Sequence, residues 1–500
     1  MNTRSYFPKK QARMAALAFL PSLLLAGGCA VGPDYARPEV QETPENWRSA
    51  APVDAPTIAN TAWWEIHKTE PELVALIHAG LENNKEIKMA VERLAQARAS
   101  LGGAGAAYLP TVSYNGAAFR GDPRTFSASY QNGFTAAGAI NWELDLWGRI
   151  RRLNESAAAS YFATAENKNA VVLALVADIA TGYFNLRTLD KQVAISEQTA
   201  STREEALKIA KARLKEGIGN AIDALQVEAD ALSARTSVVN FKEAVTLQEN
   251  ALCLLLGRAP GPILRAKDTR PKDIWQSFPA SARQVVPAGL PADLLRNRPD
   301  LRAAERNVCA ANAQIGAAIA NYFPKVSLTG TLGFFSPQLK GLFDHAGTQG
   351  GGSLLGPLFD GFATYHTVKG AEARTREAVL AFQQTALNAF RETDNALSTL
   401  HTSRERLGLL QKQVAALDEA LKKIRASYDA GKIALLPVLD ADRTLFSAKL
   451  ALVSAQNEEQ AAFVNLYKSL GGGWRTADLK LPVINANGGL SEPPPATVTP

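Results

Sequence analysis

Apolar residues recur every seven positions in two long stretches of the chain. No proline occurs between Pro123 and Pro260 or between Pro357 and Pro437, and both stretches are rich in alanine. Each stretch can therefore form one helix of roughly 65 residues, about 100 Å long at 1.5 Å per residue. A strict seven-residue spacing keeps one face on a neighbour when helices supercoil left-handedly. The positions are Leu186, Val193, Ala200, Leu207 and Leu214, and then Leu400, Leu407, Val414, Leu421 and Tyr428.

The same spacing resumes beyond a glycine in each stretch. Gly217 and Gly431 are suited to end a helix, because glycine tolerates the left-handed backbone found there. Each stretch therefore predicts an antiparallel helical hairpin, with its tip near residue 217 or residue 431. The resumed positions are Leu225, Leu232 and Val239 in the first hairpin, and Leu439, Phe446 and Val453 in the second.

Shorter segments between the helices alternate with a period of two, which is typical of strands with one apolar and one polar face. Residues 134–146 have Phe, Ile, Trp and Leu at one parity, and Thr, Asn, Glu and Asp at the other. Residues 111–115 and 325–329 alternate likewise, and a weaker fourth strand is predicted from Ser353 to Phe359. The chain thus has two predicted β-hairpins, at 108–147 and 322–361. These strands fit either a transmembrane barrel or a soluble sheet with one wet face.

The chain contains an internal duplication. Residues 106–116 (AAYLPTVSYNG) and 320–330 (ANYFPKVSLTG) share six of eleven residues at an offset of 214, and the glycines at the two hairpin tips keep that offset. We expect a first repeat at 72–257 and a second at 290–471. A leader at 29–71, a linker at 258–289 and a tail at 472–500 surround them. Two copies of one long unit indicate a quasi-symmetric scaffold.

An export signal precedes these repeats. Four basic residues come before an apolar run from Ala15 to Leu25, and Ala26-Gly27-Gly28-Cys29 follows. The arrangement resembles the lipobox of bacterial lipoproteins, so residues 1–28 are the predicted signal peptide and Cys29 the predicted lipid-attachment site. Cys253 and Cys309 do not form a disulfide framework. No later apolar run approaches the roughly 20 residues of a spanning helix, so strands must cross any membrane.

Charge and motifs narrow the function. The formal net charge is +6, and four of the basic residues lie in the signal peptide, so nothing indicates nucleic-acid binding. The five histidines form no metal-binding spacing, and no catalytic motif is complete. We expect neither an enzyme, nor a metal site, nor a cofactor beyond the lipid. Four strands cannot close a barrel in lipid, so a dimer of eight strands or a trimer of twelve is required, and a conducting pore favours the trimer.

Four sequence motifs are distributed over nearly the whole chain after Cys29: CAVGPDYARP from Cys29, Trp63-Trp64, NWELDLWGRIRR from Asn141, and LPADLLRNRPDLRAAERNVCAANAQIGAAIANYFPKVSLTG from Leu290. They resemble the motifs of the TolC-like outer membrane factors, specifically the NodT-type lipoproteins of RND efflux systems. The resemblance implies an α+β membrane protein. It would be a homotrimer, with a 12-stranded β-barrel in the outer membrane and a long periplasmic α-helical barrel. The linkers and tail would form an equatorial belt.

The resemblance also implies partners and a function. The helical tips, Gly217, Ile218, Gly431 and Lys432, would contact a periplasmic adaptor that is joined to an inner-membrane RND pump. The chain would then be a passive exit duct for drugs or other small toxic compounds, lipid-anchored to the outer membrane. The alternative is a periplasmic helical adaptor or a structural coiled-coil lipoprotein, which would share the heptads and the signal but not the strand pairs.

A gate is implied at the second tip. By the family pattern, Leu436 would form an apolar constriction ring and Asp440 a carboxylate ring, while Tyr428 and Arg443 would be hydrogen-bonded latches. Asp223 and Asp230 are possible partners for Arg443. Asp440 and Arg443 are also three residues apart on one helix, so they could simply pair with each other.

Overall fold

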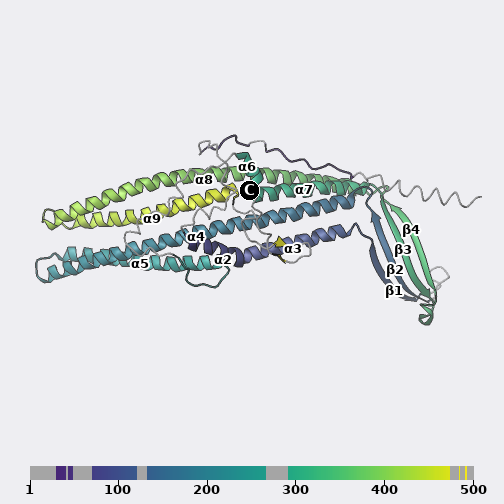
Figure 1. Cartoon of the computed structure of the whole chain (residues 1–500), viewed down its shortest axis with the longest axis horizontal. Helices are drawn as coiled ribbons and strands as arrows, with labels where there is room; N and C mark the ends of the chain where they lie inside the picture. Colours follow the sequence, from purple (N-terminus) through teal and green to yellow (C-terminus); the bar gives the residue numbers. More distant parts are fainter. Residues whose placement is uncertain are drawn as a thin grey trace, which may run out of the picture. The chain divides into compact units, whose positions relative to one another are not determined.

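The computed structural model describes residues 30–40, 43–48, 70–120, 132–265, 291–472, 483–484 and 490–491. Among these residues, long helices and one four-stranded sheet dominate (Figure 1). Two compact units divide the chain: Met1–Pro38, Gln96–Ala163 and Ala304–Phe382 form unit 1, and Glu39–Ala95, Thr164–Ala303 and Gln383–Pro500 form unit 2. The helices are α2 (Pro71–Asn83), α3 (Lys85–Ala106), α4 (Arg149–Lys215), α5 (Ala221–Leu255), α6 (Pro291–Asn297), α7 (Pro299–Ile319), α8 (Ala363–Asp429) and α9 (Leu436–Leu470). The short β5 (Val483–Ile484) and β6 (Leu490–Ser491) pair with each other.

The predicted duplication is visible in the helix lengths. Helices α4 and α8 each have 67 residues, and α5 and α9 each have 35. Both hairpins turn at a glycine with positive φ, 72° at Gly217 and 69° at Gly431. At each turn, the glycine and the residue after it donate backbone hydrogen bonds to carbonyls of the last helical turn, as in a Schellman cap.

The sheet lies within unit 1 and contains β1 (Thr111–Arg120), β2 (Asn132–Leu144), β3 (Lys325–Ser336) and β4 (Ala346–Leu355) in that order, all antiparallel. Directly opposed residues share a face. Ile140 is opposite Val112 and Gly330, whereas its neighbour Asn141 is opposite Thr111 and Thr329. One face therefore carries mainly apolar side chains, and the other mainly polar or small ones, apart from Phe119, Phe335 and Leu355. Strands β1 and β4 are its edges.

The position predicted for the fourth strand was largely wrong. Strand β4 begins at Ala346 and ends at Leu355, so the predicted segment from Ser353 to Phe359 overlaps only its last three residues. Its sequence, AGTQGGGSLL, has four glycines and few large apolar side chains. Glycine gives no alternation to detect and weakens a strand. The hydrogen bonds of the ladder with β3 hold this segment in place.

Side-chain caps and close contacts organise the start of α4 within unit 1. The carboxylate of Asp145 accepts from the backbone N–H groups of Ile150 and Arg151, at 2.9 and 2.8 Å. The buried Arg152 donates to the carbonyls of Val31 and Gly32 and to the Asp34 carboxylate, so this helix also holds the leader. Burial acts against the charge of Arg152, but its hydrogen bonds to carboxylates keep its pKa above the usual value.

A glycine and a phenylalanine occupy the equivalent turns before α4 and α8. Gly148 has φ 76°, and Phe362, which lies 214 residues later, has φ 68°. A side chain on Gly148 would overlap Ala30, because an added Cβ would lie 2.6 Å from its Cα. Phe362 is the non-glycine residue with positive φ in the described part of the chain. Its side chain is exposed and contacts Phe359 edge-on.

The expectation that no later apolar run has membrane-spanning length needs correction. Helix α4 contains an 18-residue window with a mean hydropathy of 1.4, which passes the length and composition test for a spanning helix. However, 61% of that window is buried inside the protein. Val172, Ile179, Tyr183 and Phe184 on this helix are all fully buried. Packing within unit 2 therefore accounts for the hydropathy.

The seven-residue stripes of α5 and α9 differ in burial. On α9, Val453 is fully buried, and it packs with Ile195 of α4. On α5, the corresponding Val239 is 65% exposed, and Leu225 and Leu232 are also exposed. The two copies of the hairpin thus keep the same apolar spacing, but α5 turns its stripe outward within a single chain.

Candidate functional site

The helical tips present the residues predicted to contact another protein. Ile218 is 79% exposed, and Lys432 is also exposed. Around Gly217 and Gly431, an added Cβ would meet no atom within 4 Å. The glycines are thus required by their positive φ and not by crowding. Each tip therefore exposes its glycine and the side chain that directly follows it, Ile218 or Lys432.

Arg443 connects the two helical hairpins just behind the tips. Its Nε donates to Asp230 Oδ1 of α5 at 2.8 Å, and its Nη1 donates to Asp440 Oδ1 at 3.1 Å. The Asp230 side chain is only 10% exposed, whereas that of Asp440 is 60% exposed. The hydrogen bond from Arg443 to Asp230 is the largest factor that raises the pKa of this guanidinium above its usual value. The link across the hairpins is therefore the better shielded of the two.

A second ion-pair cluster lies beside the first. Arg203 of α4 is buried, and its Nε donates to Asp442 Oδ2 of α9 at 2.9 Å. Its Nη1 donates to the backbone carbonyl of Asp230 at 3.2 Å. Arg425 of α8 donates to the other Asp442 oxygen at 3.1 Å. Arg203 also lies over the Phe446 ring, with its Cζ 5.3 Å from the centroid.

Tyr428 bonds to a different partner. Its hydroxyl accepts from Arg213 Nη1 of α4 at 3.2 Å, which gives a further link between the hairpins. A cavity of about 540 Å³ lies behind the tips in unit 2, lined by Arg203, Asp223, Tyr428 and Asp442 among others. These contacts therefore lie around a cavity between the hairpins that has both polar and apolar lining residues.

The predicted gate residues lie in one region of the structure, but they make different contacts there. Arg443 makes both alternative pairs that the sequence offered, with Asp230 and with Asp440. Asp223 lines the cavity. Leu436, at the start of α9, is half exposed. Arg203, Arg213, Arg425 and Asp442 were not among the residues predicted from the sequence. Cys29, the predicted lipid-attachment site, lies outside the described residues.

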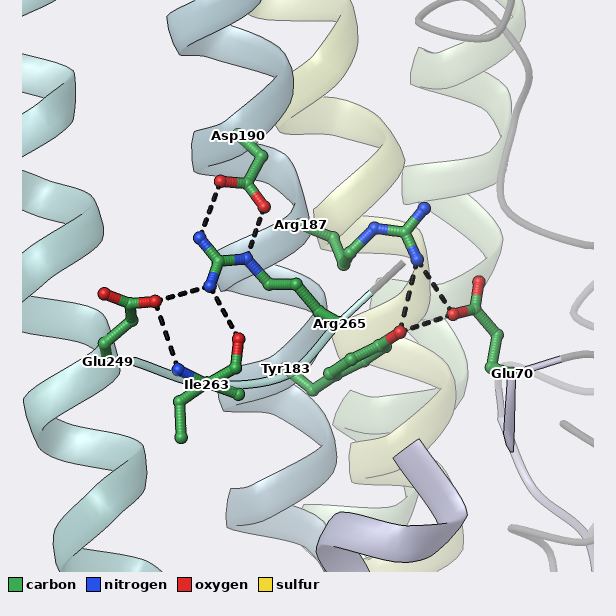
Figure 2. Close-up of polar contacts among 7 residues, drawn as sticks. All are labelled: Glu70, Tyr183, Arg187, Asp190, Glu249, Ile263 and Arg265. Carbon is green, nitrogen blue, oxygen red and sulfur yellow. Dashed lines mark hydrogen bonds and ion pairs between the residues drawn. The ribbon is translucent and has the colours of Figure 1, made fainter. Parts of the chain in front are cut away.

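Two groups of polar side chains attach linkers to the middle of α4, away from the tips (Figure 2). Glu70, just before α2, is buried, and its Oε2 accepts from the Tyr183 hydroxyl at 2.6 Å and from Arg187 Nη1 at 2.9 Å. Burial raises the pKa of Tyr183 well above its usual value, and the hydrogen bond to Glu70 adds to this. The neutral phenol is thus the form that fits this site.

Arg265 attaches the segment after α5 to the same helix. Its guanidinium makes two bonds to Asp190, at 2.6 and 2.9 Å, and one to Glu249, at 2.5 Å. The Arg265 side chain is 6% exposed, and the hydrogen bonds to Asp190 are the main factor that raises its pKa. Most of the predicted equatorial segments, including Trp63-Trp64 and residues 266–289, lie outside the described residues.

A side-chain hydrogen bond to the last turn of each repeat is conserved in position but is made by different residues in the two copies. Asn84, between α2 and α3, donates to the Leu255 carbonyl at 2.8 Å. At the equivalent position between α6 and α7, Arg298 donates to the Ser469 carbonyl at 3.0 Å. Arg298 also donates to Asp300 through Nε and Nη2, and to Glu392 through Nη2. The RPD motif in the second repeat therefore closes that repeat and adds a charged contact to α8.

Together these features define a class of protein. A sheet with one apolar and one polar face, two open edges and two very long helical hairpins is the architecture of a membrane channel built from several chains. Comparison with known proteins identifies the family to which the chain belongs. The family model for outer membrane efflux proteins matches residues 76–258 and 290–472, and the chain belongs to this family.

Individual relatives cover nearly the whole chain. The solvent efflux pump outer membrane protein SrpC of Pseudomonas putida is 33% identical over 472 residues, covering 91% of this chain and 97% of the relative. The cation efflux system protein CusC of Escherichia coli O157:H7 is 30% identical, covering 92% and 98%. The open-state structure of the MtrE outer membrane channel of Neisseria gonorrhoeae matches with a TM-score of 0.78 at 30% identity. That match covers 89% of this chain and 99% of MtrE.

These matches confirm the predicted fold class, function and location. The chain has the fold of a trimeric outer membrane efflux channel, with four strands per chain. It is the outer membrane component of an efflux system and extends into the periplasm. The two family matches begin and end within a few residues of the two repeats expected from the 214-residue offset.

Proposed function

We propose that three copies of the chain form the passive exit duct of a tripartite RND-type efflux system. The observation that carries this proposal is the register of the sheet. The four strands form one mainly apolar face and one face of mainly polar or small side chains, and β1 and β4 are the edges of the sheet. Lipid does not tolerate open edges. Pairing of β4 with β1 of the next chain would close a barrel of twelve strands with the polar face inward.

The outward stripe of α5 supports the same assembly. Leu225, Leu232 and Val239 are each more than half exposed in one chain. Their spacing is that of a coiled-coil seam. In a trimer, this face would pack against the next chain, so the helices would form a closed tube of near-sixfold symmetry. The alternative, a structural coiled-coil lipoprotein, would not require an amphipathic sheet. The match to the family of outer membrane efflux proteins also supports the channel.

The partners belong to this proposal as well. A periplasmic adaptor would contact the tips at Gly217, Ile218, Gly431 and Lys432, and an inner-membrane pump would supply energy and select substrates. The relatives are named for solvents and for cations, so the duct would carry what its own pump delivers. No step of chemistry or cofactor is needed for a passive duct. A lipid on Cys29 would anchor the mature chain.

Two measurements test the proposal. Purified protein should form detergent-dependent, heat-modifiable trimers that give discrete conductance steps in planar bilayers. In a deletion strain that carries the cognate pump and adaptor, the chain should restore drug efflux. A protein that stays monomeric and soluble without detergent, once its lipid is removed, would refute the proposed duct.

A further inference from the structure

Two phenylalanine side chains lie on the polar face of the sheet, where most of the other residues are small or hydrophilic. Phe119 is opposite Gly133, and Phe335 is opposite Thr135. Gly133 and Thr135 have the same parity on β2 as Asn141, which marks the polar face. Both rings therefore project toward the lumen of the proposed barrel and not toward lipid.

The two rings contact each other across β2. Their centroids are 6.3 Å apart, with an angle of 23° between the planes, and each residue is 43% exposed. The Phe119 ring also lies flat over Gly133, since a Cβ added there would be 2.3 Å from its Cζ. Glycine at this position thus gives the ring its place on the sheet. The result is one aromatic surface built from β1 and β3.

The surface lies at the end of the sheet opposite to the start of α4. There, the neighbouring residues of the same face are small: Ala117, Thr135, Gly333 and Gly347. Strand β4, which completes this wall, has four glycines. Within the described strands, the phenylalanine pair is therefore the large feature of the wall at the outer end of the lumen.

We infer that Phe119 and Phe335 form a low-affinity site for aromatic and lipophilic solutes at the outer mouth of the duct. The inference rests on the proposed trimer, in which six rings would surround the exit. Half-exposed aromatic rings attract flat apolar molecules by stacking. They also attract organic cations, because the face of an aromatic ring carries the negative part of the ring's quadrupole. Weak binding at the exit suits a duct, because a solute must be able to leave.

The site can be tested by channel block in planar bilayers. Tetraphenylphosphonium and tetrabutylammonium carry the same charge, but only the first has aromatic rings. Tetraphenylphosphonium added on the outer side should block the wild-type channel more strongly than tetrabutylammonium. The double variant Phe119→Ala/Phe335→Ala should raise its blocking constant roughly threefold to tenfold, which is the range expected for one or two ring contacts. Tetrabutylammonium has no rings to stack and can interact with the phenylalanines through its charge alone, so its blocking constant should change less than that of tetraphenylphosphonium.

Matched variants separate aromatic binding from other effects. Phe334→Ala alters the neighbouring ring on the opposite face and should leave block unchanged. Phe119→Leu/Phe335→Leu keeps apolar bulk, so it should weaken tetraphenylphosphonium block without a change in conductance. Gly133→Ala retains both rings but displaces Phe119 and should also weaken the block.

Equal block in the wild type and in the alanine or leucine double variant would overturn the site, and so would an equal loss in Phe334→Ala. If an alanine variant forms no channels, the leucine and Gly133→Ala variants decide the question. Failure of the wild type to form any channel would instead count against the proposed duct.

Discussion

Arg203 and Asp442, which are 239 positions apart in the chain, form an ion pair at 2.9 Å that joins α4 of the first hairpin to α9 of the second. The Arg203 side chain is 9% exposed and that of Asp442 is 20% exposed. Arg443 and Asp230 form a parallel link between α9 and α5. Two ion pairs therefore join the hairpins behind the tips, and removal of each partner has a different expected effect.

Asp230→Asn should open the channel more than Asp440→Asn does. Both substitutions remove a carboxylate bonded to Arg443, but Asp230 is well shielded and joins two hairpins, whereas Asp440 is exposed and lies on the same helix as Arg443. Exposed pairs contribute about 0 to 1 kcal/mol. We expect a several-fold rise in conductance or antibiotic leakage for Asp230→Asn and little for Asp440→Asn. A neutral control is Asp418→Asn, in an exposed pair with Lys422. The reverse order would make Asp440 the gate.

Arg203→Ala should destabilise the assembled protein. Asp442 would keep only its bond to the half-exposed Arg425, and the Asp230 carbonyl would lose a donor. Loss of one partner of a buried pair costs up to several kcal/mol, and because Arg425 remains we expect about 2 kcal/mol. Thermal melting of the detergent-solubilised protein, followed by circular dichroism, should give a lower midpoint. Arg425→Ala is the matched control and should cost about 1 kcal/mol or less. Equal midpoints for both variants would contradict the assigned roles.

The phenol of Tyr183 should make stability depend on alkaline pH. Its pKa is raised in the folded protein, chiefly by burial, so the neutral form is favoured there. Its contribution is fully present below the unfolded value of about 10 and is lost as pH rises toward the folded value. Wild type should therefore lose stability faster than Tyr183→Phe between about pH 9 and pH 11.5 in parallel thermal melts. Parallel curves would show that Tyr183 does not titrate differently on unfolding.

Phe362→Gly should stabilise the turn before α8. Phe362 has φ 68°, a conformation that costs a side-chain-bearing residue about 1 kcal/mol or more and glycine very little. Phe362→Ala keeps the backbone strain but loses the ring contact with Phe359. The glycine variant should therefore melt above the alanine variant. A glycine variant that melts below it would mean that the turn is not strained.

Helix and hairpin positions could be predicted because their signals repeat. The apolar spacing and the two tip glycines occur twice at one offset, so each copy supported the interpretation of the other. Strand β4 carried no such signal, because its glycines neither alternate nor favour a strand. The resemblance to a known family supplied Tyr428, Leu436, Asp440 and Arg443 as candidate gate residues, and the structure adds the hydrogen-bond partners of Tyr428, Asp440 and Arg443.

The missed pair did leave a trace in the sequence. Arg203 follows Ala200 by three positions, and Asp442 follows Leu439 by three. In a seven-residue repeat, that is the second seam position, which normally holds an apolar residue. Opposite charges at seam positions of two different helices point to a pair that crosses the seam. Many charged residues lie on these helices, and the register between α4 and α9 decides which of them pair. That register cannot be derived from the sequence alone.

The glycines of β4 have a consequence for biogenesis. A strand with so few side chains has little to fix its alignment, since alignment normally follows from side chains that must face one side of the sheet. Its other edge would be satisfied only by β1 of a second chain. We therefore expect the last strand to reach its final alignment when the chains meet, so that membrane insertion and oligomerisation would occur as one concerted event.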